Sequence, residues 1–471
     1  MSNVPSADDR VKPFWLFAYS LPGLPVAAMS LPLAVYLPPF YETDVGLGNL
    51  AVGIIFGATR FIDVFLDPVM GVLSDRTKTP WGRRKIWMAL AVPVMCLASL
   101  LVFMPHQGAT WPSVVASIFL LFVGYTMLSI AHLAWGSELS ADYHERSKVT
   151  ASREFAYLVG MIAVLLLPAI IQARGGDKFA QIASMGWFVV GTLPFGVAFA
   201  IWAIPEKKQT QVPVRMPLRQ VLQAVLNNKP LRYVLLSDLV AGVSGGIVAT
   251  LFIYMVTFGL QLPKAASWLL IVYFLMGAIA IPPMIWLSKK LGKHQTFVLS
   301  CVVNAVLLPC FFFLPKGEIT PAVVLFMLLG LNMSAGPFLF RAIMADVADH
   351  DHAETGEARA GVYFSLLALT NKLGYSCAIF LSYALLAYVG FSGKGNNTPD
   401  AVSSMMLMYV FPPTLISLGI GWVMWHFPID ETRQRELRSI IEGRANLAKE
   451  PEVAAVADRP ATPGFIAASA D

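Results

Sequence analysis

Charged side chains are scarce in this chain. Only 13% of its 471 residues are Asp, Glu, Lys or Arg, whereas 56% are hydrophobic. A soluble globular protein carries roughly a quarter charged residues, because its surface faces water. The deficit, with a mean hydropathy of +0.64, excludes an ordinary soluble domain and predicts that lipid covers most of the surface.

Cysteine and histidine are too few and too scattered to form a disulfide or metal framework. The four cysteines all fall inside predicted apolar helices, where we expect small buried thiols, and the seven histidines show no metal-ligand spacing. The phosphate-binding loop GxxxxGK[ST] is also missing, so nothing supports an ATP-driven pump. Without a nucleophile–base pairing or a cofactor fingerprint, we predict neither an enzyme nor a resident cofactor.

Long apolar runs recur along the whole chain, each able to cross the ~30 Å hydrocarbon core of a bilayer. Backbone polar groups in lipid must be satisfied within their own segment, which predicts helices. The short alternating segments of an outer-membrane barrel are absent. We therefore expect an all-α membrane protein with twelve transmembrane helices. The predicted spans are 14–39, 47–73, 86–104, 113–139, 155–173, 180–204, 233–259, 265–287, 296–314, 321–345, 361–391 and 402–427.

Basic residues are concentrated in alternate loops. If the N-terminus is cytoplasmic, the inside loops hold 18 Lys and Arg residues and the outside loops hold 5. This asymmetry predicts that both termini are cytoplasmic in a multi-pass protein of the inner (cytoplasmic) membrane. The net charge of +5 then reflects membrane topology, so no nucleic-acid partner is expected. No signal peptide is predicted, because the first apolar run is too long for one.

The spans divide into two sets of six. We predict a cytoplasmic N-terminus (1–12), a first six-helix bundle (13–204), a cytoplasmic linker (205–232), a second bundle (233–427) and a partly disordered cytoplasmic tail (428–471). The polar segment after the second span resembles the one after the eighth, and the segment after the fourth resembles the one after the tenth, so similar charged segments occupy the same places in the two halves. Two such halves with a small-molecule substrate between them are the layout of a secondary transporter. We expect it to be a monomer.

Three charges lie within the second predicted span. A charge in the bilayer centre costs at least ~2.5–3.5 kcal/mol on insertion scales, so such residues are rare and usually functional. Arg60, Asp63 and Asp67 are spaced i, i+3, i+7, which covers about 60° of a helix and puts them on one face. Pro68 lacks an N–H and leaves the carbonyl of Val64 without its helical partner. Two carboxylates and a spare carbonyl predict a cation or proton site; the alternative is a static Arg60–Asp63 ion pair.

A single lysine, Lys372, lies about twelve residues into the eleventh predicted span and needs an anion there. The second and eleventh spans belong to opposite halves, so a Lys372 pair with Asp63 and Asp67 would bridge the central cavity. An ammonium group can hold the carboxylates when no cation is bound, and Arg60 is then expected to neutralise and orient them. A purely structural bridge is the alternative.

Three segments, 60–85, 138–153 and above all 344–374, resemble the glycoside–pentoside–hexuronide:cation symporters of the major facilitator superfamily. This group includes melibiose permease, and the resemblance runs through residues 12–427. It implies cation-coupled symport of a sugar, a glycoside or a uronide by alternating access. A lysolipid or amphiphile carrier and a drug:proton antiporter are the alternatives, and a sensor that does not transport is disfavoured by the retained intramembrane charges.

The resemblance also implies roles for single residues. In that family the aspartates of the second helix form the cation site, a role that passes here to Asp63 and Asp67, and Lys372 matches a lysine near the cavity. Thr126 matches a threonine that helps to coordinate sodium, and Arg153, opening the fifth helix, matches an arginine tied to sugar binding.

Two departures from the family pattern bear on the ion and the substrate. Sodium-using members carry an asparagine-type side chain just before the second aspartate; here that residue is Leu66, which cannot ligate, so a proton is favoured over Na⁺. The two aspartates that bind the sugar in that family are missing. The first-helix segment 18–26 has no acidic residue, and Ser129 occupies the position of the fourth-helix aspartate. Other groups must line the cavity, unless they only pack or face lipid. Candidates for substrate binding are Tyr19, Tyr125, Ser129, His132, Trp135, Tyr254, Asn371 and Lys372.

The segment 71–85 resembles the gating loop of the superfamily. We expect Gly71 to permit close helix packing, and Asp75 to meet Arg83, Arg84 or the eleventh helix. Solvated loop charges that only set topology are the alternative. Matching latches are expected from Asp142, Glu145, Arg146, Asp346, Asp349 and Arg359. Asp238 is expected to pair with Arg232 or with the start of its helix, outside the predicted site.

Overall fold

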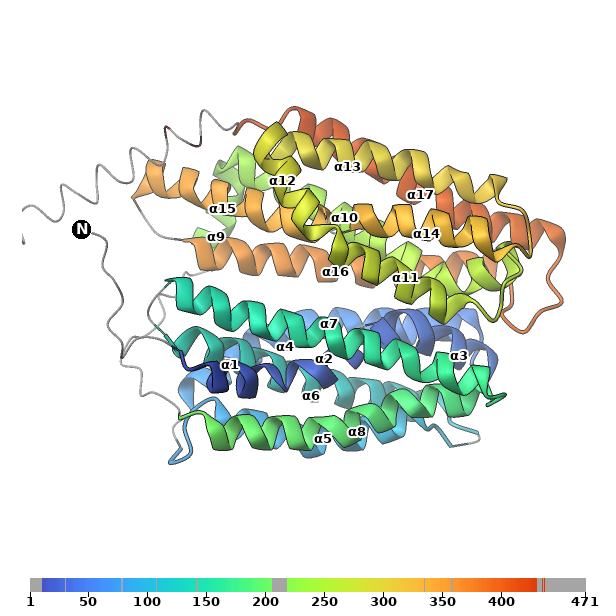
Figure 1. The fold of residues 1–471 in the computed structure, drawn as a ribbon, viewed down its shortest axis with the longest axis horizontal. Helices are drawn as coiled ribbons and strands as arrows, with labels where there is room; N and C mark the ends of the chain where they lie inside the picture. Colours follow the sequence, from blue (N-terminus) through green and yellow to red (C-terminus); the bar gives the residue numbers. More distant parts are fainter. Residues whose placement is uncertain are drawn as a thin grey trace, which may run out of the picture.

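The computed structural model describes residues 11–29, 31–77, 79–106, 108–140, 143–205, 218–333, 335–356 and 359–429, with residues 434 and 436. Within these ranges the secondary structure is helical, and the helices form two bundles that lie side by side (Figure 1). The first bundle contains α1 (Pro13–Ser20), α2 (Gly23–Ala28), the π-helix η1 (Pro32–Tyr36), α3 (Leu37–Thr43), α4 (Asn49–Arg76), α5 (Lys85–Phe103), α6 (Trp111–Glu138), α7 (Tyr143–Ala173) and α8 (Lys178–Ala203). The second contains α9 (Leu218–Asn227), α10 (Lys229–Tyr254), the π-helix η2 (Met255–Gly259), α11 (Ala266–Ile279), α12 (Ile281–Leu291), α13 (Lys293–Leu307), the 3₁₀-helix η3 (Leu308–Phe313), α14 (Ile319–Met333), α15 (Ala335–Thr355), α16 (Ala360–Tyr388) and α17 (Pro399–Trp425).

The helices confirm the predicted all-α membrane fold. In the described part of the chain, 11 helices are long and apolar enough to cross a bilayer, and α11 with α12 forms one further span that is bent by 45°. Pro282 and Pro283 lie at this bend, and proline removes a helical hydrogen bond and clashes with the preceding turn. The predicted run of twelve spans is therefore present, with one of them broken.

The first span differs most from its prediction. It was expected as one helix over 14–39, but it is divided into α1, α2, η1 and α3 and reaches Thr43. Prolines are dense here, at Pro22, Pro25 and Pro32 and again before Phe40, and each withdraws an N–H from the helical ladder. The apolar run predicted the crossing but not its breaks.

Several boundaries lie outside the predicted ones. The polar segment 138–155 is mostly helical, because α7 already begins at Tyr143, and α15 continues through 346–355. The short helix α9 lies within the predicted linker. The predicted N-terminal segment and tail fall almost wholly outside the described residues, as does 206–217.

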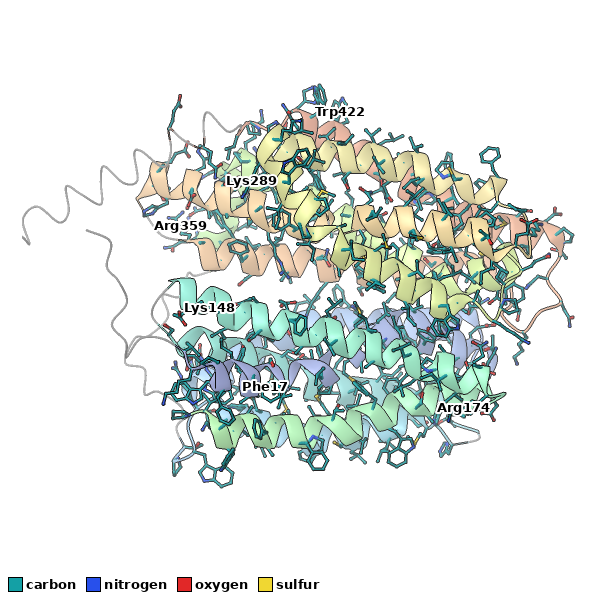
Figure 2. The ribbon with its side chains drawn as sticks, in the orientation of Figure 1. Phe17, Lys148, Arg174, Lys289, Arg359 and Trp422 are labelled. Atoms are coloured by element: carbon teal, nitrogen blue, oxygen red, sulfur yellow. The ribbon has the colours of Figure 1, made fainter. Side chains whose placement is uncertain are left out.

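Basic side chains gather at one end of the two bundles. Lys148, Lys289 and Arg359 lie at this end, which we call the basic end, whereas Arg174 lies at the opposite end (Figure 2). Lys148, Lys289 and Arg359 come from loops predicted to be inside, and Arg174 from a loop predicted to be outside. The positions agree with the predicted alternation of loops; that the basic end faces the cytoplasm stays a prediction.

The two bundles are hydrogen-bonded to each other at the opposite end. Glu42 at the end of α3 is 3% exposed, and its Oε2 accepts hydrogen bonds from the Tyr254 hydroxyl at 3.3 Å and the Gly393 N–H at 3.1 Å. Nearby, the Tyr36 hydroxyl donates to Ser267 Oγ at 2.9 Å. Tyr254, Ser267 and Gly393 all belong to the second bundle, so these contacts hold the halves together.

Closer to the middle, α4 and α16 approach each other through small residues. A Cβ at Gly53 would lie 2.7 Å from the Tyr383 Cβ, and one at Gly57 would lie 3.1 Å from the Phe380 Cβ. Only glycine allows this approach. The Ser376 hydroxyl completes the contact by donating to the Gly57 carbonyl at 2.7 Å. The candidate site lies farther along these same two helices.

Candidate functional site

Lys372 lies between two aspartates of the other half. Its Nζ is 2.8 Å from Asp63 Oδ2 and 2.6 Å from Asp67 Oδ2. The lysine comes from α16 and both carboxylates from α4, as the sequence predicted. Asp63 and Asp67 are one helical turn apart and therefore project from the same face of α4. One ammonium group thus joins the two bundles through two ion pairs.

The two aspartates differ in environment. Asp63 also accepts a hydrogen bond at Oδ1 from the Thr126 hydroxyl of α6, at 2.8 Å, and its side chain is 4% exposed. The side chains of Asp67 and Lys372 keep 29% and 26% of their surface exposed. Asp63 is therefore enclosed and fully engaged, whereas Asp67 is the carboxylate that solvent or an ion reaches first.

Arg60 does not pair with the aspartates. In the described part of the chain its recorded contact is with the ring of Tyr375, whose centroid lies 5.4 Å from the guanidinium carbon. The static Arg60–Asp63 ion pair, the alternative left open by the sequence, is therefore absent from this conformation, and a neutralising and orienting role for Arg60 stays a prediction. Lys372 already supplies the cation, and the guanidinium instead takes the aromatic face that α16 presents to it.

Leu66 packs partly buried against the hydrophobic core and offers no oxygen. The oxygen ligands within hydrogen-bond reach of Lys372 or Asp63 are thus the carboxylates and the Thr126 hydroxyl.

Three aromatic candidates of the first half, Tyr19, His132 and Trp135, are buried and pack against one another. The Tyr19 hydroxyl donates to the His132 carbonyl at 2.8 Å, and His132 Nε2 lies 2.8 Å from the Tyr19 carbonyl. Trp135 is 1% exposed. Within the described residues, Trp135 Nε1 and Ser129 Oγ are buried without a hydrogen-bond partner. In this conformation Tyr19 and His132 fasten the first span to α6, and their predicted role in substrate binding stays a prediction.

The remaining substrate candidates lie on α6, α7 and α16. Arg153 is ten residues inside α7 rather than at its start, and its Nη2 pairs with Glu154 Oε1 at 2.5 Å. Tyr125 is partly buried against the core. Asn371 is exposed and donates to Asp238 Oδ1 at 3.3 Å.

Asp238 corrects a further expectation. Its carboxylate accepts from Asn371 and, at Oδ2, from the Thr370 hydroxyl at 2.7 Å, so its partners lie on α16 rather than at Arg232 or the start of α10. The signal was available, since Asp238 is an acid within an apolar span, like Asp63 and Asp67. Because Asp238 lies near the start of α10, a partner close in sequence was predicted instead of one on α16.

The predicted gating segment forms a compact ionic network in the first half. Arg84 is 4% exposed, and its guanidinium contacts Asp75 at 2.6 Å and Glu138 at 3.0 Å and donates to Ser74 Oγ at 2.7 Å. Arg83 reaches the same Glu138 oxygen at 2.7 Å. The expected Asp75–Arg84 contact is present, and Glu138, at the end of α6, is a further partner that was not predicted.

Gly71 does not have its expected packing role. A Cβ at this position would meet no atom within 4 Å. The close approach of α4 to a neighbour occurs instead at Gly53 and Gly57, nearer to the opposite end.

The second half has ion pairs at the corresponding place. Lys293 Nζ lies 2.6 Å from Asp346 Oδ1, and Arg359 Nη1 lies 3.9 Å from Asp351 Oδ1. Lys293 and Asp351 were not predicted. Asp349 lies half-buried on α15.

The remaining latch candidates belong to the first half. Glu145 of α7 accepts from the Val11 N–H at 3.0 Å and pairs with Lys148 at 2.7 Å. Asp142 and the side chain of Arg146 lie outside the described residues.

Two helical bundles that span a membrane, with an ion-paired site where α4 and α16 meet, define a multi-pass membrane transporter. The chain matches the sequence profile of the MFS/sugar transport protein family over residues 18–431 and belongs to that family.

Curated relatives match over almost the whole chain. The isoprimeverose transporter of Lactiplantibacillus pentosus is 22% identical over 443 residues, which cover 91% of each protein. The glucuronide carrier protein homolog of Escherichia coli K12 is 19% identical and covers 88% of this chain and 93% of its own. The inner membrane symporter YicJ of the same strain is 26% identical over 400 residues, or 82% of this chain and 85% of its own.

Solved structures share the fold at low sequence identity. The nucleoside transporter NupG superposes with a TM-score of 0.65 at 14% identity, covering 88% of this chain and all of its own. A D-xylose-proton symporter also reaches 0.65, at 15% identity, covering 89% of this chain and 98% of its own.

Proposed function

We propose that the protein is a cation-coupled symporter that carries a sugar, glycoside or uronide across the cytoplasmic membrane by alternating access. The observation that carries this proposal is the position of Lys372 between Asp63 and Asp67. A structural bridge needs one acid for one base, whereas this site keeps a second, partly exposed carboxylate. The names of the relatives, an isoprimeverose transporter and a glucuronide carrier homolog, support a glycosidic substrate over an amphiphile or a drug.

The ion pairs supply the coupling. Without a bound cation, the Lys372 ammonium group balances Asp63 and Asp67. A cation that binds Asp67 replaces its pair with Lys372, so the contact between α4 and α16 loosens, and separation of the loaded halves leaves one carboxylate, Asp63, without a cation instead of two. Separation of the unloaded halves would leave both acids without a cation, which is costly inside a membrane. Movement of the halves is therefore tied to loading.

The site favours a proton as the coupling ion. Na⁺ prefers several oxygen ligands, as other hard cations do, whereas a proton needs only one carboxylate. Leu66 contributes no oxygen, and Asp63 already accepts from Thr126 and Lys372. Asp67 is the carboxylate that we assign to the proton.

The arrangement supports an inward-facing state. The contacts of Glu42 with Tyr254 and Gly393 close the opposite end. The ion pairs described at the basic end, Arg84 with Glu138 and Lys293 with Asp346, each lie within one half. We propose that the basic end is cytoplasmic and that its networks exchange partners between the halves when the transporter opens outward.

Proteoliposomes provide the direct test. We expect purified protein to accumulate a labelled glycoside or uronide when a pH gradient is imposed, and not to require sodium. Asp67→Asn should abolish accumulation but keep exchange of substrate across the membrane, because exchange needs no net ion movement. Asp400→Asn, an exposed position in the first turn of α17, is the matched control. Undiminished accumulation by Asp67→Asn would exclude this coupling site.

A further inference from the structure

A second membrane-embedded carboxylate lies outside the Lys372 site. Asp238 of α10 is 3% exposed, and its recorded partners are the Thr370 hydroxyl and the Asn371 amide. Both are neutral donors, and no cation contacts this carboxylate within the described residues. A buried carboxylate is expensive unless paired, so an acid kept in this state is expected to have a function.

A guanidinium group lies on the helix that packs against both α10 and α16. Arg341 of α15 is exposed, and α15 contacts the two helices that carry Asp238 and Asn371. The structure records no ion pair or hydrogen bond of Arg341 among the residues it describes. Charged residues in transmembrane helices almost always face the interior of the bundle or a water-filled cavity. Asp238 and Arg341 are therefore opposite charges on neighbouring helices with no recorded ion pair between them, and the exposed amide of Asn371 lies beside the carboxylate.

This cluster adjoins the proposed cation site through α16. Asn371 and Lys372 are consecutive, so their side chains project about 100° apart on the helix. Asn371 reaches Asp238 on α10, and Lys372 reaches Asp63 on α4. A ligand that displaces Asn371 would thus act on the helix that holds the Lys372 ion pairs.

We propose that Asp238, Asn371 and Arg341 form a substrate site in the second half that selects an acidic sugar, such as a uronide; this rests on the proposed function. The carboxylate of Asp238 accepts hydrogen bonds from sugar hydroxyls, and the amide of Asn371 donates and accepts. The guanidinium of Arg341 binds the sugar carboxylate through two parallel N–H donors. Asp238 would then bind the sugar hydroxyls in place of the acidic residues that 18–26 lacks. The one proton carried with each substrate would balance the negative charge of the uronide.

Binding to the purified protein separates this inference from coupling. We would measure binding of a panel of p-nitrophenyl glucosides, galactosides and xylosides and of the matching glucuronide and galacturonide. The wild type should bind a uronide more tightly than its neutral counterpart. Arg341→Gln should weaken uronide binding roughly 10- to 100-fold with little change for neutral sugars, and Arg341→Lys should be intermediate. Asp238→Asn should weaken both kinds of sugar.

Arg174→Gln, an exposed arginine at the opposite end, is the control, and uptake into proteoliposomes tells the proposals apart. Proton-driven uptake of a neutral glycoside that is unaffected by Arg341→Gln and Asp238→Asn would overturn this site while leaving the symporter standing. Uronide binding that disappears in Arg341→Gln, without proton-driven uptake in the wild type, would support the site and refute the coupling. Binding of no member of the panel would refute both.

Discussion

Lys372 Nζ and Asp67 Oδ2 lie 2.6 Å apart, although the two residues are 305 positions apart in the chain. With the 2.8 Å pair to Asp63, this contact links α16 to α4 at the site assigned to ion coupling.

Removing the lysine should destabilise this conformation. Lys372→Met leaves Asp63 and Asp67 facing each other without a cation, and breaking a buried ion pair costs about 3–5 kcal/mol, less here because Asp67 and Lys372 are partly exposed. We expect a lower melting temperature in detergent and no accumulation of substrate. The double variant Lys372→Met/Asp67→Asn should recover part of the melting temperature but not of transport; equal melting temperatures for the two variants would contradict the pairing.

The missing oxygen at Leu66 makes the choice of ion testable. Leu66→Asn adds an amide oxygen one residue before Asp67, so we expect uptake by this variant to become stimulated by a sodium gradient. Leu66→Met, which is similarly long but lacks an oxygen donor of this kind, is the control and should stay independent of sodium. Sodium-driven uptake by the wild type would show instead that the carboxylates and Thr126 suffice.

The Glu42 contacts should hold the opposite end closed. Glu42→Gln weakens charge-assisted bonds to Gly393 and Tyr254, each about 1.5–3 kcal/mol in favourable settings, and should shift the population towards an outward-open state. Spin labels at Lys178 and Lys316, exposed at that end in opposite halves, would report a longer mean distance. An unchanged distance distribution would mean that backbone packing alone closes this end.

Arg84 and Arg83 should contribute unequally to stability. Arg84 is buried and contacts Asp75, Ser74 and Glu138, whereas Arg83, which also pairs with Glu138, keeps 20% of its side chain exposed. Arg84→Gln should therefore lower the melting temperature clearly, since it removes the cation that pairs with Asp75 and one of the two that pair with the buried Glu138. Arg83→Gln is the matched variant and should have a small effect. A larger loss in Arg83→Gln would contradict the assigned hierarchy.

The sequence predicted the central contact because the cost of a charge in lipid demands a partner. Asp63, Asp67 and Lys372 are isolated in apolar spans, and few residues could satisfy them. The contact of Arg60 with Tyr375 could not be predicted, because spacing along one helix shows that residues share a face but not which neighbouring helix that face meets. Tyr375 comes from another helix, and only the packing of α4 on α16 brings it there.

Partners of the loop charges were less predictable. The basic end has many acids and bases, so Glu138 and Lys293 could not be chosen over their neighbours without knowing which helices adjoin. Asp238 was assigned to a local partner for the same reason. The fold itself followed from apolar run lengths, whereas the breaks at Pro32 and Pro282 depend on how each proline is accommodated.

The pairing of α4 with α16 has a consequence for biosynthesis. Residues of α4 are made long before Lys372, so a newly inserted first bundle holds Asp63 and Asp67 without the lysine, and with only Thr126 as a donor to Asp63 among the contacts described here. The first half alone should therefore be short-lived in the membrane, and co-expression of the second half as a separate chain should rescue it. The ion pairs that couple transport would then also serve as the signal that assembly is complete.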